Sequence, residues 1–256
     1  MPDNAHPNRW LKASQPRPAA RMRLFCFPYA GGGASVFRTW AADLPTDVEV
    51  CPVQLPGRED RIREQPFTDA SALVQALIPS LRPMLDRPFA LFGHSMGALI
   101  AYELARQLTR QQMAMPTHLF VSGRRAPTLP EPDESLHALP TDDLFLSALQ
   151  SRYNNIPAIV LQDAELREIF APLLRADMTL VERYPIGAAT PLPCPIIAFG
   201  GISDGRATRA DLLAWQGLTQ GSFDIHLMPG GHFYLNEDRQ PLLARLGNYL
   251  AAIQPS

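Results

Sequence analysis

The feature that most constrains this chain is a serine between two glycines, placed where an apolar run meets a helix-forming run. Residues 89–92 are typical of a buried strand, the pattern Gly-x-Ser-x-Gly runs from Gly93 to Gly97 around Ser95, and residues 98–108 favour a helix. Both glycines are needed because a side chain at either position would clash with neighbouring backbone. A serine in such a turn has an exposed hydroxyl group near a helix N-terminus, which favours negative charge. The pattern predicts a nucleophilic serine rather than a chance pentapeptide in a tight turn.

Short apolar runs alternate with helical patterns along the rest of the chain. The strand-like runs are 22–27, 48–53, 89–93, 118–122, 195–200 and 223–228. The helical patterns are 34–44, 68–85, 96–112, 208–218 and 236–253. This alternation predicts an α/β fold, a doubly wound sheet of buried, parallel strands with helices on both faces.

The chain of 256 residues is expected to form one domain over residues 22–256. Residues 1–21 are polar and rich in proline, which predicts a flexible N-terminal lead-in. Trp10 and Leu11 lie within this segment and could pack onto the domain.

Residues 124–190 interrupt the alternation. They contain no convincing strand, but a proline-rich connector and helical patterns at 141–152 and 163–184, the second with Pro172 as an expected break or kink. An insertion of this length is uncommon between strands unless it forms a lid or a binding element. We expect a helical lid, and a plain helical cap that only shields the sheet edge is the alternative.

Composition argues against several classes of protein. A formal net charge of -2 provides no basic field for nucleic acid. No apolar run approaches the roughly 18 residues of a membrane span, and the start of the chain has no hydrophobic signal core, so we expect a cytoplasmic protein without a membrane partner. Cys26, Cys51 and Cys194 lack the spacing of metal or redox sites and are expected to be free thiols.

His232 is the predicted base for Ser95. His226 and His232 are the histidines in the last third of the chain, which is where a base follows a nucleophile of this kind. His226 falls inside a strand-like run, whereas His232 follows Pro229-Gly230-Gly231 in a loop before the last helix. A base must approach the serine from a loop at the carboxyl edge of the sheet, which favours His232.

Asp204 is the predicted acid that orients this histidine. It is the only carboxylate in the loop 200–205, which follows the last strand before the one that leads to His232. Asp204 could instead cap the following helix. Glu131 or Asp133, after the strand at 118–122, is the alternative acid.

Two backbone N–H groups are expected to face the oxyanion of the reaction. One belongs to Met96, which follows the serine, and the other to Ala30, in the glycine-rich loop 28–33 after the first strand. Such a loop could also hold a dinucleotide phosphate, but the pattern Gly-x-Gly-x-x-Gly is not completed. We expect neither a cofactor nor a metal.

Four motifs together resemble the type II thioesterases of nonribosomal peptide and polyketide synthesis, which belong to the α/β-hydrolase superfamily. They are Phe27-Pro28-Tyr29-Ala30-Gly31-Gly32-Gly33, Gln54-Leu55-Pro56-Gly57-Arg58-Glu59, Gly93-His94-Ser95-Met96-Gly97 and Gly230-Gly231-His232-Phe233. The resemblance implies an α/β-hydrolase fold with a mobile helical lid. It also implies a triad of Ser95, Asp204 and His232, with oxyanion amides at Ala30 and Met96.

The function implied by the resemblance is editing in antibiotic biosynthesis. A stand-alone enzyme of this kind removes stalled or wrongly loaded acyl groups from the phosphopantetheine arm of carrier proteins. A carboxylester hydrolase would use the same triad and is the alternative function. A non-catalytic binding module is a further alternative, which the intact triad argues against.

The resemblance implies an acidic carrier protein as partner, and two basic clusters could meet it or its phosphate. Arg58, Arg61 and Arg63 follow the strand at 48–53, where interleaved acids, among them Glu64, could pair with them locally. Arg124 and Arg125 follow the strand at 118–122 without adjacent acids. The second cluster is the better candidate.

Overall fold

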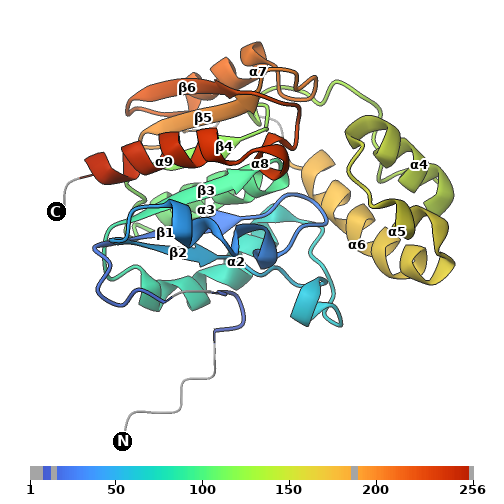
Figure 1. Ribbon diagram of the computed structural model, residues 1–256, viewed down its shortest axis with the longest axis horizontal. Helices are drawn as coiled ribbons and strands as arrows, with labels where there is room; N and C mark the ends of the chain where they lie inside the picture. Colours follow the sequence, from blue (N-terminus) through green and yellow to red (C-terminus); the bar gives the residue numbers. More distant parts are fainter. Residues whose placement is uncertain (1–7, 13–15, 186–189, 254–256) are drawn as a thin grey trace, which may run out of the picture.

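The computed structural model describes residues 8–12, 16–185 and 190–253, in which six parallel strands form one sheet (Figure 1). Neighbouring strands lie in the order β2-β1-β3-β4-β5-β6. Their bounds are β1 (Met22–Phe27), β2 (Val48–Pro52), β3 (Phe89–His94), β4 (Leu119–Ser122), β5 (Ile196–Gly201) and β6 (Phe223–Met228). The predicted strands and their parallel arrangement are confirmed.

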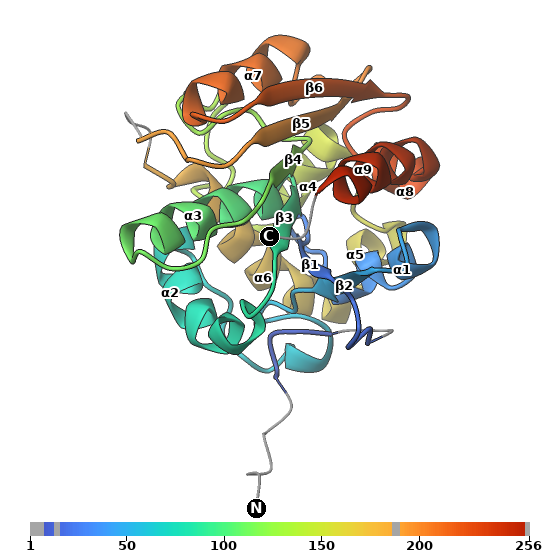
Figure 2. The same cartoon turned by 90° about the vertical axis from the view of Figure 1, so that its left-hand side faces the viewer.

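Helices cover both faces of the sheet (Figure 2). One face carries α2 (Ala70–Leu81), α3 (Met96–Arg110) and α7 (Arg209–Leu213), and the other carries α1 (Trp40–Asp43), α8 (Tyr234–Glu237) and α9 (Gln240–Ala252). Short 3₁₀ turns span Ala34–Phe37, Glu59–Arg61, Arg82–Met84 and Ala214–Leu218. Successive strand residues alternate between the two apolar layers, as Phe25 and Cys26 do, which explains why the strands read as unbroken apolar runs. The predicted doubly wound α/β fold is confirmed.

The two edges of the sheet differ in how they are covered. Residues 8–12 run along β2, where Leu11 forms an antiparallel bridge with Val53 and the Gln54 amide donates to the Trp10 carbonyl at 2.8 Å. β6, at the opposite edge, has mostly half-exposed residues, so the expectation that every strand is buried is wrong for β6. An edge strand has a partner on one side only.

Three helices between β4 and β5, here called the insertion helices, project beyond the sheet (Figure 1). They are α4 (Asp142–Tyr153), α5 (Ala158–Gln162) and α6 (Ala164–Glu182), of which α5 was not predicted. α6 runs through Pro172 without the expected break. Proline removes one backbone hydrogen bond, and the burial of its neighbours Ala171 and Leu173 outweighs that loss.

The insertion helices have an apolar cluster of their own. Its buried members are Leu136, Phe145, Leu146, Leu149, Ala171, Leu174 and Met178. The far end of α6 belongs instead to the sheet core, through Leu180 and Val181. None of the described helices is long and apolar enough to cross a membrane.

Candidate active site

Ser95 occupies the sharp turn between β3 and α3. Its backbone has φ +53° and ψ −114°, a strained conformation, and its amide donates to the Ser122 carbonyl at 2.8 Å. A Cβ atom at Gly93 would lie 2.1 Å from the Gly97 carbonyl oxygen, and one at Gly97 would lie 2.1 Å from that of Phe27. The chain can therefore pass through this turn only with glycine at both positions.

Ser95, His232 and Asp204 form one hydrogen-bonded series. His232 Nε2 lies 3.1 Å from Ser95 Oγ, and His232 Nδ1 lies 2.9 Å from Asp204 Oδ2. The other Asp204 oxygen accepts the backbone amides of Arg206 and Ala207, at 2.8 and 3.3 Å. The three residues follow β3, β6 and β5, so the parallel sheet brings them to one edge. The structure thus brings together the three residues singled out from the sequence.

The alternative candidates have other partners. Glu131 pairs with Arg124, and Asp133 pairs with Arg206. His226 lies within β6 and bonds the Tyr249 hydroxyl at 2.8 Å. The cap of α7 is Thr208 rather than Asp204.

Aromatic rings surround His232. Its ring centre lies 4.9 Å from Phe233, 5.3 Å from His94 and 5.4 Å from Tyr153, the last residue of α4. The His94 side chain is fully buried and bonds Ser122 Oγ at 2.8 Å. Burial, followed by repulsion from His232, holds the pKa of His94 well below its usual value. Sequence reasoning missed this second histidine as a site residue, although it stands inside the Gly-x-Ser-x-Gly pattern.

The amides of Ala30 and Met96 lie beside the serine. Both residues line the same cavity as Ser95, and neither amide donates a hydrogen bond within the described part of the chain. The next two amides of the glycine-rich loop are occupied, since Gly31 donates to Asp177 at 2.8 Å and Gly32 to the Tyr29 carbonyl at 2.9 Å. The arrangement leaves the two predicted oxyanion donors free to meet a ligand.

The cavity beside Ser95 is apolar and small. It measures about 50 Å³, and side chains of the insertion helices, among them Leu149, Leu174 and Met178, form one wall. A larger groove of about 510 Å³ shares Ala30 and Leu174 with it. An apolar chain attached at Ser95 has room along this path.

Arg58 is engaged inside the protein. Its side chain is buried, and the guanidinium forms a bidentate ion pair with the buried Asp177 of α6, with N···O distances of 2.9 and 2.8 Å. Its neighbour Arg61 pairs with Glu64 at 2.6 Å, which confirms the expected local pairing. The Arg58 guanidinium is therefore not on the surface where a carrier protein could meet it.

Arg124 and Arg125 also have carboxylate partners. Arg124 is buried beside Glu131, and Arg125 Nη2 lies 2.9 Å from Asp211 Oδ1. Both line a small polar cavity that Ser95 and His232 share. The sequence placed these arginines beside Ser95 but did not reveal their partners.

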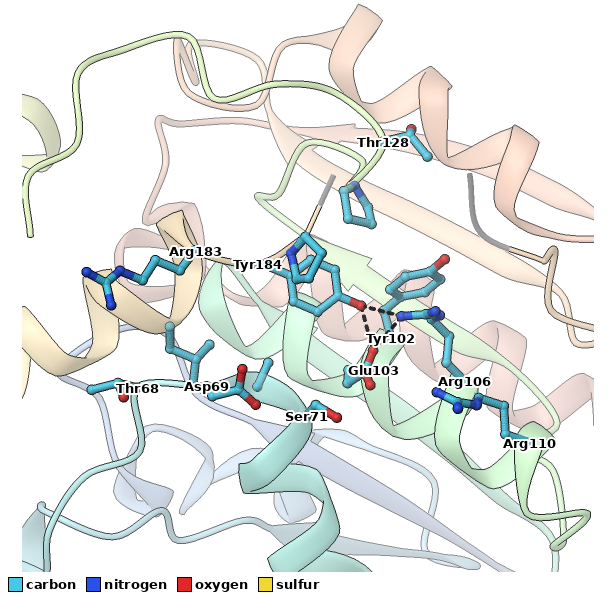
Figure 3. Close-up of a pocket in the computed structure, with 14 residues that line it drawn as sticks. Thr68, Asp69, Ser71, Tyr102, Glu103, Arg106, Arg110, Thr128, Arg183 and Tyr184 are labelled. Atoms are coloured by element: carbon cyan, nitrogen blue, oxygen red, sulfur yellow. Dashed lines mark hydrogen bonds and ion pairs between the residues drawn. The ribbon is translucent and has the colours of Figure 1, made fainter. Parts of the chain in front are cut away.

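A separate cavity of about 320 Å³ lies among α2, α3 and the end of α6 (Figure 3). There the Tyr184 hydroxyl donates to the buried Glu103 at 2.6 Å and accepts from Arg106 at 3.0 Å. None of Ser95, His232 and Asp204 lines this cavity. The contacts fasten the end of the insertion to α3, the helix that begins at Met96.

The cysteines play no part in the site. Cys26, Cys51 and Cys194 are buried and unpaired, which confirms the prediction of free thiols. Burial raises the pKa of the Cys51 thiol to about 12 and that of the Cys194 thiol to about 11, so neither is a reactive thiolate. Within the described ranges, no three His, Cys, Asp or Glu side chains are grouped closely enough to hold a metal ion.

The site has the geometry of a serine hydrolase, because a serine, a histidine and an aspartate form one hydrogen-bonded series at the carboxyl edge of a parallel sheet.

Comparisons with known proteins narrow this class. A model of the thioesterase domain family matches residues 22–248. Gramicidin S biosynthesis protein GrsT of Aneurinibacillus migulanus is 44% identical, over 92% of this chain and 91% of its own.

Solved structures agree with this match. RedJ, a thioesterase from the prodiginine biosynthetic pathway of Streptomyces coelicolor, is 43% identical with a TM-score of 0.84, over 93% of this chain and 94% of that one. BorB, the type II thioesterase from the borrelidin biosynthetic cluster, is 34% identical with a TM-score of 0.83, over 96% of this chain and 98% of that one. The chain belongs to the thioesterase family and groups with the type II thioesterases of nonribosomal peptide and polyketide pathways. Its reaction class is the hydrolysis of acyl thioesters.

Proposed function

We propose that this chain is a stand-alone editing enzyme that removes acyl groups from the phosphopantetheine arm of carrier proteins. The observation that carries the proposal is the hydrogen-bonded series Ser95, His232 and Asp204, found in a member of the thioesterase family. Relatives that take part in the biosynthesis of gramicidin S and prodiginine support a role in antibiotic pathways. The cytoplasmic location remains a prediction.

In the proposed first half-reaction, Ser95 Oγ attacks the thioester carbonyl while His232 Nε2 takes the hydroxyl proton. The Ala30 and Met96 amides stabilise the oxyanion. Asp204 accepts a hydrogen bond from His232 Nδ1, which fixes the histidine tautomer and stabilises the imidazolium. The tetrahedral intermediate then collapses, the bond between the acyl carbon and the carrier sulfur breaks, and His232 gives its proton to the departing sulfur. The carrier thiol leaves easily because a thiol pKa of roughly 8.5 makes the thiolate a good leaving group.

In the second half-reaction, water attacks the acyl-serine and His232 acts first as base and then as acid. The acyl chain lies in the apolar cavity between the sheet and the insertion helices. This position gives the insertion the role of a lid over the substrate, because its side chains form one wall of that cavity.

The carrier protein is the proposed partner, with Arg124 and Arg125 as predicted contacts and Arg58 as a weaker one. Ion pairs with carboxylates favour structural roles for all three guanidiniums. Kinetics of the double variant Arg124→Ala/Arg125→Ala on two substrates separate these roles. A raised KM on an acyl-carrier alone supports docking, and equal losses on a short acyl-thioester mimic support an internal role.

The proposed function is tested by intact-mass analysis of carrier proteins loaded with different acyl groups, with wild-type protein and with Ser95→Ala. We expect the wild type to remove acyl groups through an acyl-enzyme and Ser95→Ala to fold but remove none. Faster hydrolysis of a matched oxygen ester than of the thioester would indicate a carboxylester hydrolase. If a fluorophosphonate probe does not label Ser95, the chain is a binding module and the proposal is wrong.

A further inference from the structure

A small polar cavity adjoins Ser95 and His232 and is distinct from the apolar one. Its volume is about 10 Å³. A water molecule needs roughly 10–15 Å³, so the cavity has the size of one water. Both reacting side chains of the proposed mechanism, Ser95 and His232, form part of its wall.

Three arginines supply hydrogen-bond donors around this cavity. Arg124, Arg125 and Arg206 all line it, and in each the Nε atom is buried without an acceptor among the described residues. Their Nη2 atoms are held by carboxylates, those of Glu131, Asp211 and Asp133 respectively. A buried charged donor without a partner is unfavourable, and one water in this cavity would satisfy at least one of the three.

Tyr153 borders both the polar cavity and the apolar one, as Ser95 does. Its ring centre lies 5.4 Å from the ring centre of His232 and 5.7 Å from the guanidinium carbon of Arg206. An acyl chain in the apolar cavity therefore leaves the polar cavity open to a second reactant.

We propose that this polar cavity holds the water that hydrolyses the acyl-enzyme, and that at least one of Arg124, Arg125 and Arg206 positions it through its Nε–H. The proposal rests on the function proposed for Ser95 and His232. The water accepts a hydrogen bond from a guanidinium Nε–H and donates one to His232 Nε2. Glu131, which also lines the cavity, can accept the other hydrogen. The remaining lone pair faces the acyl group on Ser95.

The step balances without any further reactant. The water oxygen forms a bond to the acyl carbon while His232 Nε2 takes one of its protons. The tetrahedral intermediate then collapses, the bond between the acyl carbon and Ser95 Oγ breaks, and His232 returns the proton to Ser95 Oγ. The free carboxylic acid leaves, and the arginines exchange no proton.

The test separates formation of the acyl-enzyme from its hydrolysis. Arg124→Met, Arg125→Met and Arg206→Met are mixed in turn with a short acyl-thioester mimic. Thiol release reports acylation, and intact mass reports the acyl group on Ser95 over time. Arg110→Met is the matched control, because Arg110 is an exposed arginine of α3 that lies outside the polar cavity.

At least one of the three variants is expected to slow hydrolysis of the acyl-enzyme by about tenfold or more, as expected for the loss of a hydrogen bond to a charged group. Thiol release in the first turnover stays unchanged, so acyl-Ser95 accumulates. A purely structural role would slow both steps. Where a Met variant does not fold, the Lys variant takes its place, because lysine keeps the charge opposite the carboxylate but has no Nε–H.

Two results overturn the water site: equal slowing of both steps in every affected variant, or unchanged hydrolysis of the acyl-enzyme in all three. A wild-type protein that releases no thiol from the acyl-thioester mimic would instead contradict the proposed function. The two failures are therefore distinguishable in one experiment.

Discussion

The Arg58 guanidinium and the Asp177 carboxylate connect the loop after β2 to α6 across 119 residues of sequence. Asp177 Oδ2 accepts from Arg58 and also from the Gly31 amide, at 2.9 and 2.8 Å. Gly31 adjoins Ala30, whose free amide lines the cavity beside Ser95. One buried carboxylate therefore holds both the insertion and the glycine-rich loop in place.

Removing this carboxylate is expected to affect both stability and turnover. Asp177→Ala leaves the buried Arg58 charge unpaired, which lowers the free energy of unfolding by about 3–5 kcal/mol. It also frees the Gly31 amide, so kcat falls as Ala30 shifts. Urea denaturation and steady-state kinetics measure the two effects. Asp143→Ala is the control, because Asp143 pairs with Arg167 on the surface and its loss is worth about 0–1 kcal/mol. Equal stability of the two variants would contradict this account.

The two candidates for the acid that orients His232 should respond differently when asparagine replaces aspartate. Asp204→Asn is expected to lower kcat on the order of 10⁴-fold, because an amide cannot hold His232 in the required tautomer. Asp133→Asn should change kcat little, since Asp133 contacts Arg206 and not the histidine. Turnover of an acyl-thioester by both variants gives the comparison. A large loss in Asp133→Asn with near-normal Asp204→Asn would move the acid to the earlier loop.

The turn at Ser95 should not tolerate the addition of even one methyl group to its glycines. In Gly97→Ala the new Cβ would meet the Phe27 carbonyl, so we expect a loss of about 1–3 kcal/mol in stability together with lower kcat. Gly205→Ala is the control, because Gly205 adjoins Asp204 but has no neighbouring atom within 4 Å of the new Cβ. Thermal unfolding and turnover distinguish them. Wild-type behaviour of Gly97→Ala would show that the backbone adapts.

The free energy of unfolding should decrease as the pH is lowered below neutrality, and His94 is one cause. Its pKa in the folded protein is well below the ordinary 6.5, since burial disfavours the charged imidazole. Below pH 6.5 the unfolded chain therefore binds a proton that the folded protein does not, and the free energy of unfolding decreases. Denaturation between pH 8 and roughly pH 5 measures the slope, which His94→Gln should reduce. His118, whose pKa burial also lowers, accounts for part of the slope that remains. An identical slope in His94→Gln would contradict the assignment.

Tyr153 should influence which acyl groups are hydrolysed. Tyr153→Ala removes a large ring that borders the apolar cavity, so kcat/KM is expected to rise for bulky acyl groups relative to short ones. Tyr153→Phe keeps the ring and should retain the wild-type preference. A series of acyl-thioester mimics of increasing size measures both profiles. An unchanged profile in Tyr153→Ala would place size selection elsewhere.

The sequence revealed those parts of the site that depend on local patterns. The glycines around Ser95 and the glycine pair before His232 are constraints on single turns, and the strand and helix patterns place these turns at one edge of the sheet. Pairing between distant side chains leaves no such pattern. The partners of Arg58 and Arg124 were therefore missed, as was the buried position of His94 against Ser122. Helix α5 spans only Ala158–Gln162, too short for a clear periodicity.

The separate apolar cluster of the insertion has a consequence for how such enzymes diversify. Leu149, Leu174 and Met178 line the acyl cavity and belong to this cluster, whereas β3 and the first turns of α3, which hold Ser95, pack in the sheet core. Substitutions that reshape the acyl cavity thus fall mainly outside the layers that form the nucleophile turn. Substitutions in the insertion can therefore change which acyl groups are hydrolysed during evolution, while the folding of the catalytic framework is left nearly undisturbed.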